Sequence, residues 1–555
     1  MSIAVPGRCG PRPELVAAHT APGLWEGNRV DSHLRESAAR HPDRLALVDR
    51  GDEWTYGALD REVDRWAAAL RQHGVGPGAV VSWQLPNWAE AVLLHQATLR
   101  LGAISNPIIP IYRHSEVSFI LRQARSKILF VPATFRGFDF PSMVRDIRDE
   151  LPDPATVVVV GDAPTEDGVV ALNAFLATAA SMPPPADGQP PHDANAVALL
   201  LYTSGTTSSP KGALHTHNTL DYENRSMVEF FGLTSSDVVF MPSPVAHITG
   251  VLYGLQLPFM LGGAVVLLDV WEPGAGLELI ERHGCTFMVA ATPFLHGLVH
   301  HPTRSPEATR TLRAFACGGA DVPPELVRRA AHELDCLVSR IYGSTEFPTA
   351  TSSNMSDPPE KRARTDGRAI GSAQLMVVDD RDRPVPSGKP GHLLVRGPEL
   401  FIGYLDEALN ADAFTPEGWF RTGDLAIVDA EGYVEITGRE KDIIIRGGEN
   451  ISAKEIEDRL FEHPKIADVA VVAVPDPVLV ERACAVVVPE PGVSVDLAEL
   501  TTWLREHHRL AMQKLPEHLV VIDELPRTAS GKVQKFKLRD RLRRSAAPIQ
   551  DQEEQ

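Results

Sequence analysis

The sequence predicts an α/β protein with a large N-terminal domain of α/β subdomains and a β-rich subdomain, followed by a small mobile α+β C-terminal domain. Short β-branched runs alternate with helical patterns, which is typical of sheets with mainly parallel strands. Between Gln374 and Val434 the pattern becomes β-rich, with turn signals at Asp379–Asp382 and Asp429–Gly432. The length of 555 residues is too great for one hydrophobic core, so we expect at least two domains.

Apolar periodicity places the individual elements of these regions. In the N-terminal region we expect strands at residues 44–48, 80–84, 128–131 and 156–160, and helices at 59–73, 88–101 and 115–124. In the C-terminal region we expect helices at 453–462 and 496–507, and strands at 466–474, 482–489 and 519–521. The apolar run 251–270 is interrupted by Pro258 and Gly262–Gly263, and predicts a buried helix, turn and strand rather than a membrane span.

A change of pattern near Gly438 predicts the domain boundaries. We expect a large domain over residues 1–438, a hinge at 439–441, a small domain over 442–545 and a disordered tail at 546–555. The Pro-rich segment 182–192 is predicted to be a surface linker between two subdomains.

The composition narrows the classes of partner. The formal net charge of −19 disfavours nucleic acid and anionic membranes as main partners. The 5 cysteines form no metal-ligand spacing, and together with the absence of a signal-peptide pattern they favour a cytoplasmic protein with reduced thiols. We expect no membrane span, and a homodimer is compatible with the sequence.

The segment Thr203–Gly212 has the composition of a phosphate-binding loop. It follows a buried apolar strand and combines small residues, hydroxyls and Lys211. Exposed backbone N–H groups, hydroxyls and one ammonium suit a polyphosphate. The loop does not fit the Walker A spacing. A Ser/Thr-rich surface linker is the alternative, although a linker has no need of the Lys-Gly ending.

The loop resembles the signature loop of the adenylate-forming superfamily, which includes acyl-CoA synthetases, aryl-CoA ligases, adenylation domains and firefly luciferase. The resemblance implies that ATP phosphates contact Thr203, Ser204, Gly205, Thr206, Thr207 and Lys211. The family usually has Gly where this chain has Ser208, which can stiffen the loop.

Further segments match the family in the expected order. Tyr342-Gly343-Ser344-Thr345-Glu346 resembles the Y-G-x-T-E motif, which implies Tyr342 against adenine, Thr345 on a phosphate and Glu346 on Mg²⁺. Cys317-Gly318-Gly319-Ala320 is similar to the segment where the backbone passes close to adenine and the acyl group. Taken alone, each of these segments is equally compatible with a tight turn.

The C-terminal motifs complete the resemblance. Asp424 in Arg421-Thr422-Gly423-Asp424 would accept hydrogen bonds from the ribose, and Arg439 would touch it. Lys441 falls at the hinge position, and Gly447–Gly448 would line the path of the CoA thiol. Lys532 in Pro526–Lys532 resembles the lysine that bridges the carboxylate and the α-phosphate, although a solvated lysine is the ordinary reading of a basic tail.

The acid-binding region is predicted around Pro244–Gly250. His247 occupies the position near the carboxylate, and Ile248 stands where amino-acid-activating relatives have Asp, so an α-amino acid is disfavoured. Small residues would leave room for a cyclic, branched or otherwise bulky acid: Ala246, Ala290, Ala291, Ala316 and Gly318. The N-terminal half looks most like cyclohexanecarboxylate- and medium-chain acyl-CoA ligases.

The resemblance implies ATP-dependent conversion of a carboxylic acid to acyl-AMP, followed by thioester formation with CoA, with Mg²⁺ as the metal. Three alternatives stay open. In the first, the chain passes its adenylate to a carrier protein or a separate enzyme. In the second it acts as a luciferase-like oxygenase, and in the third it binds nucleotide without catalysis. A non-catalytic protein would be expected to lose Lys532 or Glu346, and both are present.

Overall fold

The computed structural model describes residues 11, 13–150, 156–162, 168–181, 193–203, 210–319, 322–446, 449–476, 479–508, 510–528 and 531–546. The predicted linker 182–192 lies outside this set, as does the tail beyond the last helix, α19, which ends at Ala546. Among the described residues, no helix has the length and apolar character needed to cross a bilayer.

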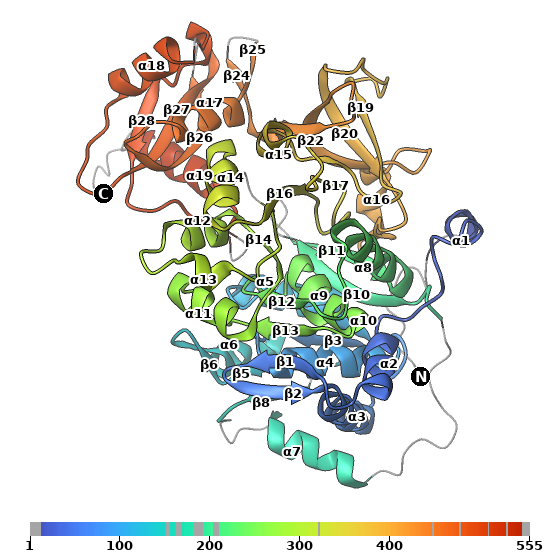
Figure 1. Cartoon of the computed structure of the whole chain (residues 1–555). Helices are drawn as coiled ribbons and strands as arrows, with labels where there is room; N and C mark the ends of the chain where they lie inside the picture. Colours follow the sequence, from blue (N-terminus) through green and yellow to red (C-terminus); the bar gives the residue numbers. More distant parts are fainter. Residues whose placement is uncertain are drawn as a thin grey trace, which may run out of the picture.

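Two large sheets form the N-terminal part (Figure 1). The nine-stranded sheet has the order β18-β17-β16-β15-β14-β12-β13-β1-β2, and the eight-stranded sheet has the order β21-β11-β10-β4-β3-β5-β8-β9. Neighbouring strands from β16 to β1, and from β10 to β9, pair in parallel, as the alternation of strands and helices predicts.

The bounds of the elements in these sheets are as follows. The nine-stranded sheet consists of β18 (Arg368–Ala369), β17 (Thr351–Ser352), β16 (Leu337–Tyr342), β15 (Ala314–Gly318), β14 (Phe287–Ala290), β12 (Val238–Met241), β13 (Ala264–Leu267), β1 (Leu45–Asp49) and β2 (Asp52–Thr55). The eight-stranded sheet consists of β21 (Gly403–Tyr404), β11 (Lys211–Thr216), β10 (Val197–Thr203), β4 (Ile104–Pro107), β3 (Val80–Trp83), β5 (Ile128–Pro132), β8 (Thr156–Val160) and β9 (Val169–Ala171). A short hairpin of β6 (Thr134–Phe135) and β7 (Phe138–Asp139) stands apart.

Helices fill the space between the two sheets and cover their outer faces. The shared core lies around α3 (Tyr56–Gln72), α4 (Ala89–Arg100), α8 (His217–Phe231), α9 (Ile248–Leu255) and α10 (Leu257–Leu261). In α4 every residue except Glu90 is buried, as expected for a helix with apolar contacts on all sides. The outer faces carry α5 (His114–Ala124) and α6 (Phe140–Asp146) on one sheet, and α11 (Pro273–His283), α12 (Thr292–His300) and α14 (Pro324–Glu333) on the other.

The smaller helices lie at the periphery: α1 (Pro13–Thr20), α2 (Ser32–Arg40), α7 (Leu172–Ala177), α13 (Pro306–Thr309), α15 (Pro359–Arg364) and α16 (Asn410–Ala413). The β-rich region is an antiparallel sheet of β19 (Gln374–Val378), β20 (Pro390–Arg396), β22 (Phe420–Val428) and β23 (Val434–Arg439). Both predicted turns connect strands of this sheet, β19 to β20 and β22 to β23.

The small domain follows β23 and contains a sheet of β25 (Glu449–Ser452), β24 (Ile443–Arg446), β27 (Val480–Pro489) and β26 (Ile466–Asp476), with β28 (His518–Val521) beside β27. Side chains on β26 alternate between the two faces. Val469 and Val471 face α17 (Ala453–Phe461) and α18 (Leu497–Glu506), whereas Ala470 and Val472 face α19 (Lys535–Ala546). Figure 1 shows this domain (red) at one end of the molecule, beside α12 and α14. The predicted fold class, a large α/β part with a β-rich subdomain and a small α+β C-terminal part, is therefore confirmed.

Candidate functional site

Several segments named by the sequence meet at one edge of the nine-stranded sheet. The strands β12, β14, β15 and β16 are parallel, so their carboxyl ends lie at the same edge, where ligands bind in open α/β sheets. His247 follows β12, Ala291 follows β14, Gly318 ends β15 and Tyr342 ends β16. The fold thus brings together residues that are separated by up to a hundred positions in the chain.

Glycines allow these segments to approach one another. A Cβ on Gly318 would lie 2.4 Å from the carbonyl oxygen of Ile341 on the neighbouring strand. A Cβ on Gly343 would lie 1.9 Å from the carbonyl oxygen of Pro348. Because no side chain fits at either place, both positions require glycine. Gly319 has a φ of +76°, and Ala320 lies outside the described residues.

Tyr342, Asp424 and Arg439 form a hydrogen-bonded group. The Tyr342 hydroxyl donates to Asp424 Oδ2 at 2.6 Å, and Arg439 Nε lies 3.1 Å from Asp424 Oδ1. Asp424 and Arg439 are register partners on β22 and β23, so the antiparallel sheet fixes their pairing. Burial, and then the negative charge of Asp424, raise the pKa of Tyr342 well above its usual value. The residues that the resemblance assigns to adenine and ribose therefore lie in contact with one another.

The Thr345–Glu346 turn is held by a residue that the sequence did not single out. His215 Nε2 lies 2.7 Å from the Thr345 carbonyl oxygen, and its Nδ1 lies 3.1 Å from Thr219 Oγ1. Burial lowers the pKa of His215 to about 4, so the ring is neutral at physiological pH and carries one N–H for the carbonyl. The Ser344 backbone N–H closes the turn by donating to the Phe347 carbonyl oxygen at 2.8 Å.

Tyr404 contacts both Glu346 and Lys211, and it is a second residue that the sequence motifs did not indicate. The Tyr404 hydroxyl donates to Glu346 Oε1 at 2.7 Å, and Lys211 Nζ lies 5.3 Å from the centre of the Tyr404 ring. Within the described part of the chain, no group of three His, Cys, Asp or Glu side chains could hold a metal ion. A lone carboxylate beside hydroxyls still fits Mg²⁺, which takes one or two carboxylates and completes its shell with phosphate oxygens and water.

The phosphate loop joins two paired strands. Thr203 ends β10, Lys211 begins β11, and the two residues are register partners in the antiparallel ladder. Ser204–Ser209, which include the predicted phosphate contacts Ser204, Gly205, Thr206 and Thr207 and the atypical Ser208, lie outside the described residues. The two ends of the loop are thereby fixed beside each other.

Lys532 of the small domain lies at the edge formed by the large domain. Burial and the positive charge of Arg439 lower the pKa of Lys532 to about 7, while Asp424, Asp442 and Glu346 act in the opposite direction. Burial and the charge of Lys532 in turn lower the pKa of His247 to about 4. A Cβ on the preceding Gly531 would lie 2.8 Å from Pro293 Cγ in α12, so the loop packs tightly on the large domain.

The residues named for the acid pocket lie in the same region. His247 caps the N-terminus of α9, and Ile248 begins that helix as a buried apolar side chain. The alanines at this edge are all buried: Ala246 and Ala316 in the core between the sheets, and Ala290 and Ala291 in the core beneath α12.

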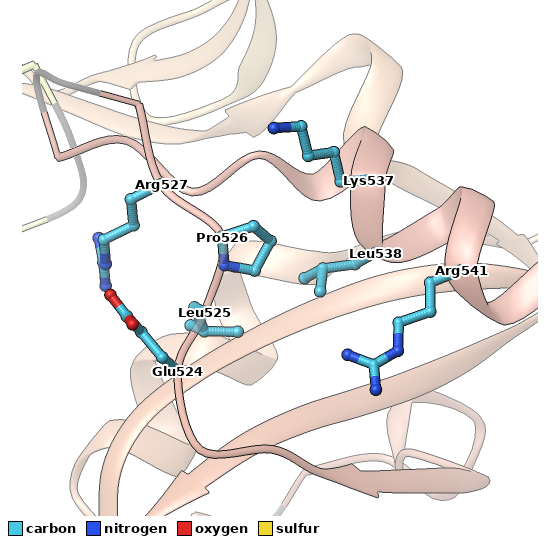
Figure 2. A pocket seen from close by; sticks show the side chains of 7 residues that line it. All are labelled: Glu524, Leu525, Pro526, Arg527, Lys537, Leu538 and Arg541. Carbon is cyan, nitrogen blue, oxygen red and sulfur yellow. The ribbon is translucent and has the colours of Figure 1, made fainter. Parts of the chain in front are cut away.

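Lys441 lies in a single 3₁₀ turn, Glu440–Asp442, that connects β23 to β24 and so joins the large and small domains. Gly447 and Gly448 lie outside the described residues. The segment that leads to Lys532 borders a surface cavity of about 360 Å³ on the small domain (Figure 2). Its walls include Pro526, Arg527, Lys537 and Arg541, and none of the predicted site residues.

Comparison with family models agrees with this geometry. The model described as "AMP-binding enzyme" matches residues 34–405, and the model described as "AMP-binding enzyme C-terminal domain" matches residues 455–532.

Curated relatives and solved structures resemble almost the whole chain. A medium-chain fatty-acid–CoA ligase of Escherichia coli (strain K12) is 38% identical over 531 residues, covering 95% of this chain and 93% of the relative. A salicylyl-CoA synthase / salicylate adenylyltransferase of a Streptomyces species is 36% identical over 540 residues, covering 95% and 96%.

Among solved structures, ATP-bound MatB from Rhodopseudomonas palustris superposes with a TM-score of 0.82 at 28% identity, covering 92% of this chain and 98% of that one. The anthranilate CoA ligase AuaEII in complex with anthranoyl-AMP gives a TM-score of 0.84 at 25% identity, covering 94% and 98%. The matched models span most of the chain, and the residues they contain converge on one edge of the sheet with Lys532. The chain therefore belongs to the family of AMP-binding enzymes.

Proposed function

We propose that the protein is an AMP-forming acid–thiol ligase, which activates a carboxylic acid with ATP as acyl-AMP, releases pyrophosphate and then forms a thioester with CoA. The observation that carries this proposal is the position of Lys532. The preceding Gly531 packs against Pro293 of the large domain, and the Lys532 ammonium group lies within electrostatic range of Asp424, Arg439, Glu346 and His247. CoA ligases and aryl-AMP ligases among the relatives support the same reaction.

The first half-reaction needs two anions to meet, so catalysis consists of positioning and neutralising charge. The carboxylate attacks the α-phosphorus in line, and pyrophosphate leaves. In this proposal Tyr342 packs on adenine, Asp424 and Arg439 hold the ribose, and Lys211 with the loop after Thr203 binds the leaving phosphates. Mg²⁺ held by Glu346 would add positive charge at the phosphates.

Lys532 would bridge the carboxylate and the α-phosphate. In the ligand-free protein its pKa is lowered to about 7 by burial and by Arg439. A bound phosphate places negative charge beside the ammonium, which raises the pKa again. Lys532 is therefore protonated in the complex, where its charge is needed.

For the second half-reaction we propose that the small domain rotates about Lys441, withdraws Lys532 and brings Gly447–Gly448 to the site. A thiol would then displace AMP. Lys441 suits a hinge because it lies in the short turn between two sheets. Transfer to a carrier-protein thiol is the second candidate, since a salicyl-AMP ligase / salicyl-S-ArCP synthetase of Mycobacterium tuberculosis is 34% identical over 548 residues.

The substrate is proposed to be a cyclic, branched or otherwise bulky acid and not an α-amino acid. Ile248 beside His247 offers no partner for an ammonium group, whose unpaired burial is costly. The names of the relatives include medium-chain fatty-acid, salicylate and 2-hydroxy-7-methoxy-5-methyl-1-naphthoate ligases.

One experiment tests the function. The purified protein is incubated with ATP, Mg²⁺ and a panel of aliphatic, cyclic, aromatic and amino acids, with and without CoA, and AMP, pyrophosphate and thioester are followed by mass. We expect pyrophosphate with cyclic or medium-chain acids and thioester only when CoA is added. Pyrophosphate without thioester would favour carrier transfer, and no nucleotide turnover with any acid would refute adenylation.

A further inference from the structure

Tyr404 contacts two charged groups that the proposed function assigns to the phosphates of ATP. Its hydroxyl donates to Glu346 Oε1 at 2.7 Å, and its ring lies under Lys211 Nζ at 5.3 Å. Tyr404 itself belongs to none of the motifs that carry the resemblance, and it lies 58 positions from Glu346 in the chain.

The backbone around Tyr404 is fixed from two sides. Strand β21 pairs with β11, the strand that begins at Lys211, through Ala213↔Tyr404 and Leu214↔Gly403. The Asn410 carboxamide accepts from the Tyr404 N–H at 2.8 Å and donates to its carbonyl oxygen at 3.3 Å. Gly403 has a φ of +132°, a backbone conformation that favours glycine, and a Cβ there would press on Asn410 Oδ1 at 3.1 Å.

The tyrosine ring is also fixed. Tyr404 is 6% exposed, and its ring packs edge-on against Phe401 with the ring centres 4.8 Å apart. The Phe401 N–H donates to the Glu346 carbonyl oxygen at 2.8 Å, so the same short segment holds both the backbone and the side chain of Glu346. With backbone and ring held, the hydroxyl has a defined position relative to the Glu346 carboxylate.

The hydroxyl fixes how Glu346 presents its charge. A phenol has one O–H to donate, and here it is given to Oε1, which leaves Oε2 available to a metal ion. Hydrogen bonds of this kind orient metal-binding carboxylates and keep their oxygens in place. The face of the ring attracts the Lys211 ammonium group at the same time.

We infer that Tyr404 is a positioning residue for the pyrophosphate end of the site. Its hydroxyl orients Glu346 toward Mg²⁺, and its ring holds Lys211 at the foot of the phosphate loop. One side chain therefore sets the relative positions of the two positive charges that meet the leaving group. The inference rests on the proposed function, because it assumes that Glu346 and Lys211 serve a Mg²⁺–nucleotide.

Two variants separate the two contacts. Tyr404→Phe keeps the ring and removes the hydroxyl, whereas Tyr404→Leu removes both. The matched control is Tyr222→Phe, because Tyr222 is also buried, accepts a hydrogen bond from the Ser372 N–H at 2.8 Å, and lies 5.5 Å from the Arg225 guanidinium carbon. Neither partner of Tyr222 belongs to the site.

Calorimetry measures binding of α,β-methylene-ATP with Mg²⁺ and with EDTA, and binding of an acyl-sulfamoyl-adenosine, which needs no metal. For Tyr404→Phe we expect about tenfold weaker binding with Mg²⁺, the scale of losing a hydrogen bond behind a metal ligand, and unchanged binding in the two metal-free cases. Tyr404→Leu should also weaken the binding of α,β-methylene-ATP in EDTA, because Lys211 loses its contact with the aromatic ring. Tyr222→Phe should match wild type in all three titrations.

The inference is overturned if Tyr404→Phe binds the Mg²⁺ complex as tightly as wild type, or if its affinity for the acyl-sulfamoyl-adenosine falls equally, which would indicate a purely structural role. Failure of the proposed function looks different: wild type itself would bind neither nucleotide nor acyl-adenylate analogue, and the inference would fall with it.

Discussion

Substituting Gly531 by alanine should separate the two half-reactions, because this glycine contacts the large domain next to Lys532. An added Cβ would lie 2.8 Å from Pro293 Cγ and 2.9 Å from Pro293 Cδ, closer than real Cβ atoms come to other atoms. Pro293 is fixed in the first turn of α12 and has little room to move. Overpacking of this kind costs about 1–3 kcal/mol, which lowers the ratio of docked to undocked molecules by about 5–150-fold.

The backbone adds a second cost. Gly531 has a φ of +82°, where an L-residue costs about 1–2 kcal/mol whether or not the domains are docked. This backbone cost does not favour one arrangement over the other. From the contact with Pro293 we expect Gly531→Ala to lower acid-dependent ATP–pyrophosphate exchange by about 10–100-fold, while thioester formation from supplied acyl-adenylate changes much less.

A second substitution tests the cause. Pro293→Ala removes Cγ and Cδ, so combined with Gly531→Ala it should restore much of the lost exchange, and a double-mutant cycle measures the coupling. Equal losses in both half-reactions, or no recovery in the double variant, would refute the reasoning from the contact.

Further predictions concern charge. Lys532→Ala should lower pyrophosphate exchange by about 10²–10³-fold and spare the thioester step from supplied acyl-adenylate; equal losses would contradict its role. Binding of an acyl-sulfamoyl-adenosine at pH 8 should take up most of one proton, because the pKa of Lys532 is lowered to about 7 in the free protein and anionic ligand raises it. Calorimetry in two buffers of different ionisation enthalpy measures this uptake, and Lys532→Ala should abolish it; an equal uptake in the variant excludes Lys532 as its source. The melting temperature should fall as the pH is lowered from 6.5 toward 4, because burial lowers the pKa of His215 to about 4 and of His95 to about 3, so that only the unfolded chain binds these protons. Scanning calorimetry across this range should show the fall, and a flat profile would contradict it.

Local pattern predicted most elements of the fold. The expected strand 156–160 coincides with β8, and the expected helix 88–101 matches α4 within a residue at each end. The apolar run 251–270 contains a helix and a strand, as expected, but a second short helix, α10, stands where the sequence predicted only a turn. The order of strands did not follow from pattern, because β1 pairs with β13 across more than two hundred residues. Such pairings depend on packing between distant segments, which local periodicity does not encode.

The residues of the site also fall into those that the sequence predicted and those that only the fold shows. Motif resemblance named Tyr342, Asp424 and Lys532, and the structure brings them together. It did not name His215 or Tyr404, whose roles depend on hydrogen bonds to residues 130 and 58 positions away. Their side-chain types are common in cores, and only the folded contacts distinguish them.

The pairing of Asp424 with Arg439 determines which contacts survive a rotation at Lys441. Both residues belong to the antiparallel sheet that precedes the turn Glu440–Asp442, so the proposed ribose contacts stay with the large domain. Lys532 instead moves with α19, which is tied to the small domain by Arg539–Asp442 at 2.9 Å and Lys535–Glu457 at 2.7 Å. The activated acid would remain anchored by its nucleotide while the lysine is exchanged for a thiol. A mixed anhydride retained in this way would stay on the enzyme between the two steps, so that little of the ATP spent would be lost by release of the intermediate.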